Sequence, residues 1–198
     1  RDLRMSRGLG DVYKRQIYDG MKFEDALRLA QKLGYAEKDP TADVEGHDAC
    51  RKICIISSLV YGKHVYPDSV HTEGISDIKL EDVQIVNKWG GSIKLIAKVS
   101  AVGNGKILPI VMPMIVPFDN LISRVDDVFN AVLVSGDAID KTLFYGRGAG
   151  KLPTASAVVA DVIDALKEGV KVHDSLFWKP AEKPEGLLED RNTYSWYL

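Results

Sequence analysis

The sequence has little cysteine and no long run of apolar residues. Its two cysteines, Cys50 and Cys54, are too few and too close together for a disulfide framework, which favours a reducing compartment. No apolar stretch is long enough to cross a membrane, and none has the form of a signal peptide's hydrophobic region. We therefore expect a cytoplasmic protein that does not bind membranes.

An excess of positive charge is also missing. The chain has 26 lysines and arginines against 28 aspartates and glutamates, and the basic residues form no cluster, so we expect no nucleic-acid partner. With 198 residues, 45% of them hydrophobic, the chain can bury one good core. This predicts one domain with short appendages.

The two ends of the chain differ from this domain. Residues 1–16 are basic and only weakly periodic, and we expect a foreign or disordered leader there. Residues 167–198 are charged and contain prolines, which predicts a linker.

Apolar residues at helical spacing predict a first helix over 22–34, with Gly34 as its stop. A second helix is predicted from about Val44 to Tyr61, ending at Gly62. Its expected buried residues are Ala49, Ile53, Ile55, Ile56 and Leu59. The pattern from His64 to Lys79 is irregular, and a short helix should follow from Leu80 to near Trp89.

Strand patterns dominate the second half. β-branched runs at 92–102 and 107–117 flank Gly103-Asn-Gly105, and runs at 130–135 and 140–145 form another predicted hairpin. Prolines at 109, 113 and 117 confine the second strand to an edge or to positions whose amides need no partner. With a last helix over 153–166, we expect an α+β fold: a mixed or antiparallel sheet of about four or more strands, with helices packed on one face.

Carboxylates gather around the start of the second helix. Asp48 and Lys52 are four residues apart, so they lie on one helix face. Asp43 is expected at the N-cap or next to it, and Glu37 at the end of the preceding helix. A fold that brings the two helix ends together would place these four side chains in one pocket. A pocket rich in carboxylates suits the ammonium group of a ligand and keeps a lysine charged. The alternative is an ordinary N-cap with a surface ion pair.

Two other motifs are weaker. His47, Cys50 and Cys54 resemble a metal motif, but a structural zinc site normally has four ligands and no further cysteine exists, so we expect no metal site. The run Gly146-Arg-Gly-Ala-Gly150 opens the last helix and would let a ligand approach the backbone, or it is no more than a loop. Its spacing differs from the dinucleotide-binding Gly-x-Gly-x-x-Gly fingerprint, which this chain lacks.

Two stretches of the sequence together closely resemble the homoserine dehydrogenase family. They are Gly34-Tyr-Ala-Glu37 with Asp39-Pro-Thr-Ala-Asp43-Val-Glu-Gly-His-Asp48 and Lys52, and Tyr145-Gly-Arg-Gly-Ala-Gly150 with Leu152-Pro-Thr-Ala-Ser-Ala-Val-Val-Ala-Asp161. The resemblance runs from about Ile17 to about Ala165, and it implies a catalytic, substrate-binding domain over residues 17–166. The family's His-Pro-Leu-Ala type loop is replaced here by Asp119-Asn-Leu-Ile122, so the detail of that loop does not carry over.

The resemblance implies NAD- or NADP-dependent interconversion of L-homoserine and L-aspartate 4-semialdehyde, in threonine and methionine biosynthesis. In this interpretation Lys52 donates the proton, Asp43 assists it, and Glu37 and Asp48 hold the amino acid. Gly148, Gly150 and Thr154 lie on the cofactor side.

The same resemblance implies a homodimer, a last helix that returns to a Rossmann domain, and a truncated regulatory domain after residue 167. Without the nucleotide-binding domain, the chain is expected to be inactive alone. The alternative is a non-catalytic dimerisation or amino-acid-binding module.

Overall fold

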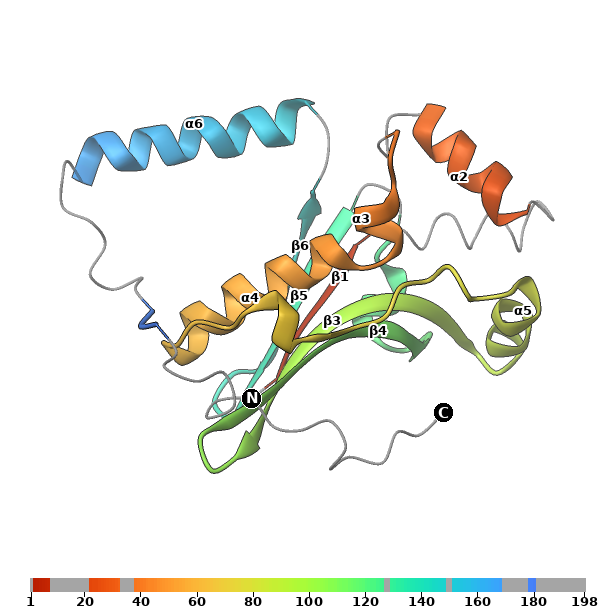
Figure 1. The fold of residues 1–198 in the computed structure, drawn as a ribbon, viewed down its shortest axis with the longest axis horizontal. Helices are drawn as coiled ribbons and strands as arrows, with labels where there is room; N and C mark the ends of the chain where they lie inside the picture. The colour runs from red at the N-terminus through yellow and green to blue at the C-terminus, as the bar shows by residue number, and fades with distance from the viewer. Residues whose placement is uncertain are drawn as a thin grey trace.

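The computed structural model describes residues 2–7, 22–32, 38–126, 129–148, 151–168 and 178–180. The strands of this part of the chain form one six-stranded sheet (Figure 1). The helices are α2 (Phe23–Lys32), α3 (Thr41–Val44), α4 (His47–Tyr61), α5 (Leu80–Lys88) and α6 (Lys151–Glu168). The strands are β1 (Asp2–Arg7), β2 (His71–Thr72), β3 (Gly91–Gly103), β4 (Lys106–Pro117), β5 (Phe129–Gly136) and β6 (Asp140–Arg147), with two 3-10 turns, η1 (Pro67–Ser69) and η2 (Leu121–Arg124).

Both predicted hairpins are confirmed. β3 and β4 pair antiparallel around a turn in which Gly103, Asn104 and Gly105 all have positive φ, and β5 pairs antiparallel with β6. In the described part, the outer side of β4 is paired only by the two-residue β2, at Ile110 and Val111. Its three prolines therefore lie in a strand that is almost an edge, as their missing amides require.

β1 occupies the middle of the sheet, whose order is β2-β4-β3-β1-β5-β6. It pairs antiparallel with β3 on one side and β5 on the other, and so joins a mixed three-stranded part to an antiparallel pair. The expectation of a disordered leader is therefore wrong for residues 2–7, whose backbone groups are paired in two ladders. Residues 8–16 lie outside the described ranges, and the foreign origin of the segment stays a prediction.

The main core lies between one face of the sheet and helices α3, α4 and α5. Odd-numbered residues of β3 contribute the floor, and the helices cover it. This core includes Val44, Ile53, Val83, Val86, Ile93, Leu95, Ala97 and Val99. A mixed sheet with these helices on one face confirms the α+β prediction. No helix in the described ranges is long and apolar enough to span a membrane.

The inward face of α4 differs from the prediction. Cys50, Ile53, Cys54, Ser57 and Ser58 are buried, whereas Ile55 and Leu59 are 51% and 40% exposed. The expected burial of Ile55 and Leu59 is therefore wrong. Small residues face the sheet because they let the helix lie close to it, and a buried serine is tolerated where it is bonded: the Ser58 hydroxyl donates to the Cys54 carbonyl and accepts from the Val65 amide.

The segment 178–180 returns to the C-terminal end of α4. Lys179 pairs with Lys63, its amide donates to the Gly62 carbonyl at 3.0 Å, and its carbonyl accepts from the His64 amide at 2.9 Å. The Trp178 indole donates to His64 Nδ1 at 2.8 Å. Part of the predicted linker is thus anchored, and whether it leads to a regulatory domain stays a prediction.

Candidate functional site

Asp48 and Lys52 form the centre of the candidate site, on the first two turns of α4. Lys52 Nζ lies 2.8 Å from Asp48 Oδ2, which confirms that the two side chains share a helix face. Both are half-buried, with 43% of the Lys52 side chain and 31% of the Asp48 side chain exposed. An ion pair this exposed adds little to stability. Its groups remain accessible to a ligand.

The turn before α4 is built differently from the prediction. Asp43 lies inside the separate short helix α3, and α4 begins after Gly46, which has φ of 76° and no side-chain cap. The prediction of Asp43 at the N-cap, or next to it, of a helix from about Val44 is therefore wrong, because Gly46, in the left-handed region, interrupts the helix there. Asp43 still lies close in sequence to the Asp48–Lys52 pair, in the helix that directly precedes α4.

Asp39 fixes the start of α3. Its Oδ1 accepts hydrogen bonds from the Thr41 hydroxyl at 2.6 Å and the Thr41 amide at 3.1 Å. These bonds favour the carboxylate and hold the pKa of Asp39 below its usual value. The Asp-Pro-Thr sequence therefore has a local structural role next to the candidate site.

A second segment, residues 73–76, supports the turn between α3 and α4. The Ile75 amide donates to the Val44 carbonyl at 2.9 Å, and the Ser76 hydroxyl donates to the Glu45 carboxylate. Gly74 lies so close that a Cβ there would be 2.7 Å from both the Val44 carbonyl oxygen and the Glu45 Cα. These are backbone atoms, so the turn itself would have to move.

We expect Gly74→Ala to lower the free energy of unfolding by about 1–3 kcal/mol, the usual cost of overpacking. Gly146→Ala is the matched control, because a Cβ at that position meets nothing within 4 Å. Urea unfolding of both variants measures the difference. Equal stability of the two variants would contradict the close approach at Gly74.

The buried side of α4 carries the two cysteines. Cys50 Sγ lies 3.8 Å from the Pro67 carbonyl oxygen. A hydrogen bond from Cys54 lowers the pKa of the Cys50 thiol and raises that of Cys54, which keeps its proton. His47 is exposed while both thiols are buried, and the described residues contain no group of three side chains suited to a metal ion.

The predicted cofactor-side residues follow β6. Gly148 and Thr154 are both exposed, the latter in the first turns of α6. Gly150 and Glu37 lie outside the described residues, so their predicted roles stay predictions. A Cβ at Gly148 would lie 1.7 Å from Asn130 Nδ2, a close contact that the sequence did not indicate.

The structure adds one buried charged group that sequence reasoning missed. Lys94 is 2% exposed, and its Nζ donates to the Val125 carbonyl at 2.7 Å and to Asp126 Oδ1 at 2.8 Å. The available signal was a lysine inside the apolar run Ile93-Lys-Leu-Ile-Ala97.

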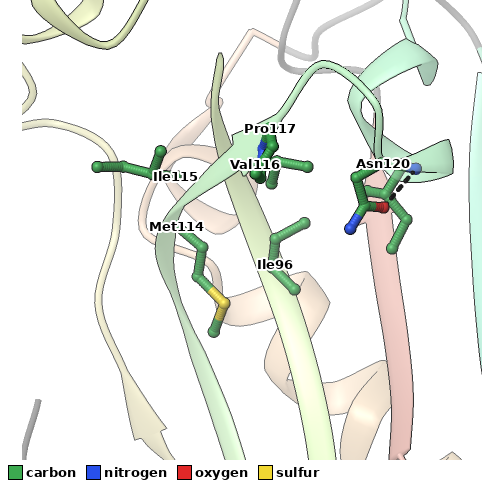
Figure 2. A pocket seen from close by; sticks show the side chains of 7 residues that line it. Ile96, Met114, Ile115, Val116, Pro117 and Asn120 are labelled. Carbon is green, nitrogen blue, oxygen red and sulfur yellow. Dashed lines mark hydrogen bonds between the residues drawn. The ribbon is translucent and has the colours of Figure 1, made fainter. Parts of the chain in front are cut away.

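A cavity of about 90 Å³ lies on the same side of the sheet as Lys94 (Figure 2). This side, opposite helices α3, α4 and α5, is the second face of the sheet. It is lined by Ile96, Met114, Ile115, Val116, Pro117, Asn120 and Ile122. Asn120 Oδ1 accepts from the Ile122 amide, so its side chain is engaged in shaping η2. None of the predicted site residues that the structure describes lines this apolar cavity.

Comparison with known proteins finds one family. Residues 12–163 match the family described as homoserine dehydrogenase. The chain is 43% identical over 185 residues to a homoserine dehydrogenase of Neisseria gonorrhoeae, covering 90% of this chain and 42% of that protein. It is 46% identical over 148 residues to one of Pseudomonas aeruginosa, covering 75% and 34%.

Solved structures agree with the sequence relatives. A homoserine dehydrogenase from Thiobacillus denitrificans has a TM-score of 0.79 at 39% identity, covering 94% of this chain and 43% of that one. A hyperthermophilic archaeal homoserine dehydrogenase in complex with NADPH has a TM-score of 0.67 at 26% identity, covering 87% and 49%. The chain thus spans less than half the length of these relatives.

Proposed function

The chain belongs to the homoserine dehydrogenase family, and from this premise we propose that it forms the substrate-binding half of an NAD- or NADP-dependent enzyme. The reaction is the interconversion of L-homoserine and L-aspartate 4-semialdehyde, in the cytoplasm. The observation that carries the proposal is the accessible Asp48–Lys52 pair, with Nζ and Oδ2 at 2.8 Å. A carbonyl that becomes an alkoxide needs a nearby acid, and a lysine ammonium held by a carboxylate is one.

Each site residue then has one task. Lys52 donates a proton to the aldehyde oxygen in the reducing direction and takes it back in the oxidising direction. Asp48 and Glu37 bind the ammonium group of the amino acid, and Asp43 orients Lys52. NAD(P) supplies the hydride chemistry when it is bound. Gly148, Gly150 and Thr154 would lie beside it, and the exposure of Gly148 and Thr154 fits that position.

A nucleotide-binding domain is needed to complete this site. α6 lies apart from the sheet (Figure 1), and large apolar side chains on it are exposed. They are Leu152, Val158, Val159, Val162, Ile163 and Leu166. We propose that this apolar surface packs on a Rossmann domain, and that this chain alone turns over little substrate.

A homodimer is the proposed assembly. Helices α3, α4 and α5 cover one face of the sheet, and the second face carries the apolar cavity lined by Ile96 and Met114 (Figure 2). A second copy on this face would cover that apolar surface. Sedimentation equilibrium tests the assembly: the mass of a dimer supports it, and a monomer at high concentration would oppose it.

Fusion to a nucleotide-binding half tests the enzyme function. The nucleotide-binding half of the Neisseria gonorrhoeae homoserine dehydrogenase is joined to the N-terminal side of Arg1, with β1 kept because it lies in the middle of the sheet. Homoserine-dependent reduction of NAD⁺ or NADP⁺ by the fusion is expected, with little or none from the unfused chain.

A folded but inactive fusion would favour the non-catalytic module instead. In that case a homoserine-dependent rise in melting temperature of the unfused chain, lost in Asp48→Asn, would identify an amino-acid-binding site. A dimer without any such rise would leave dimerisation as the function.

A further inference from the structure

The first residues of β5 hold the end of β6 from both faces of the sheet. Phe129 is paired with Arg147 and Asn130 with Gly146 in the β5–β6 ladder. Because successive strand residues point to opposite faces, Phe129 and Asn130 lie on opposite sides of the sheet. Both act on the same short segment, Tyr145–Gly148, from which the chain leaves the sheet toward α6.

On the second face, Phe129 lies between two side chains of this segment. Its ring stacks on Tyr145, with ring centroids 4.8 Å apart and planes 9° apart. The guanidinium carbon of Arg147 lies 5.3 Å from the Phe129 centroid. Both contacts are attractive, and they order two side chains that are otherwise exposed.

On the helix-covered face, the Asn130 amide occupies the space of a Gly148 side chain. A Cβ at Gly148 would lie 1.7 Å from Nδ2 and 2.4 Å from Cγ of Asn130. A Cβ at Gly146, two residues earlier, would meet nothing within 4 Å. Gly148 is therefore required for the close packing of Asn130, and not for a positive φ.

α6 follows this segment in the sequence. Every described α6 side chain is exposed except that of Pro153, which is half-buried, so packing against the described part of the sheet does little to hold the helix. The last described residues before α6 are Arg147 and Gly148, at the end of β6.

We propose that Phe129 and Asn130 are positioning residues of the dehydrogenase reaction. They hold the backbone of Tyr145–Gly148, and through it they place the cofactor-side residue Gly148 and the start of α6. Neither residue transfers a proton. This inference rests on the proposed function, because that function assigns Gly148 to the cofactor side.

The test combines a double-mutant cycle with two readouts. The variants are Asn130→Ala, Gly148→Ala and the double variant, with Gly146→Ala as the matched control. In the 198-residue chain, the amide NMR shifts of Tyr145 and Arg147 are expected to change in Asn130→Ala and in Gly148→Ala, and the shift of Gly148 is expected to change in Asn130→Ala. The Gly148→Ala change should be smaller when Asn130 is also alanine, since the clash is then removed.

In the fused enzyme, Asn130→Ala and Gly148→Ala are expected to raise the KM for the dinucleotide roughly 10–100-fold, with the KM for homoserine unchanged. Independent, additive effects of the two substitutions would overturn the proposal, as would unchanged Gly148 shifts in Asn130→Ala. If the fusion is inactive in every form, the proposed function fails, while the NMR cycle still decides whether Asn130 holds Gly148.

Discussion

Replacing Lys52 by alanine is expected to lower kcat of the fused enzyme by about 10²–10⁴-fold, the usual contribution of a general acid or base. The Lys52 ammonium, 2.8 Å from Asp48, is the group proposed to protonate the aldehyde oxygen. Without it the alkoxide loses its proposed proton donor. Steady-state kinetics with homoserine and with the aldehyde measure the loss in both directions.

Two further variants separate proton transfer from charge. Lys52→Arg keeps a cation that can pair with Asp48, but a guanidinium does not give up its proton, so kcat should fall nearly as far. Arg51→Ala removes the adjacent exposed cation and should leave kcat within a few-fold. If Lys52→Ala kept kcat within a few-fold of the parent, Lys52 would not be the acid.

Asp126→Asn is expected to cost about 3–5 kcal/mol of the free energy of unfolding, the range for breaking a buried ion pair. The reason is that the Lys94 ammonium, 2% exposed, keeps its hydrogen bond to the Val125 carbonyl but loses the negative charge that balances it, because a neutral amide replaces the carboxylate. Lys94→Met should cost less, because the methionine fills the apolar part of the space and Asp126, 19% exposed, can be hydrated by water. Urea unfolding followed by circular dichroism gives both values.

The pair itself is tested by the double variant. Lys94→Met with Asp126→Asn should cost less than the sum of the single changes, since the buried ammonium and its carboxylate are removed together. Lys98→Met, on the same face of β3 and only half-buried, is the matched control and should cost less than about 1 kcal/mol. A cost below about 1 kcal/mol for Asp126→Asn would contradict a charged Lys94 in the interior.

Local patterns predicted the elements well where each residue could be assigned a face by its neighbours. The hairpins over 92–117 and 130–145 followed from β-branched residues around glycine turns. α4 was harder, because apolar residues occupy nearly every position from Ile53 to Val60, so helical spacing alone does not define the inward face. The inward face of α4 is set by how closely the sheet approaches the helix, so the small side chains of Cys50 and Cys54 point inward instead of Ile55 and Leu59.

In the candidate site too, features that depend on local spacing were predicted, and features that depend on distant segments were missed. The Asp48–Lys52 contact depends only on helical spacing and was predictable. Asp43 was misplaced because the break at Gly46 depends on its packing against Val111 and Thr72, which are distant in sequence. Lys94 and Asn130 were missed for the same reason, since their partners Asp126 and Gly148 come from other segments of the chain.

The central position of β1 has a consequence for how the chain folds. Leu3 pairs with Val99 in β3 and with Val134 in β5. Both partners lie far along the chain, and such pairings raise the contact order of the fold. Until β5 has been synthesised, β1 keeps an open edge that can pair with another chain. We therefore expect slow folding with a risk of aggregation, because β1 cannot complete its pairing until β5, far along the chain, has been synthesised.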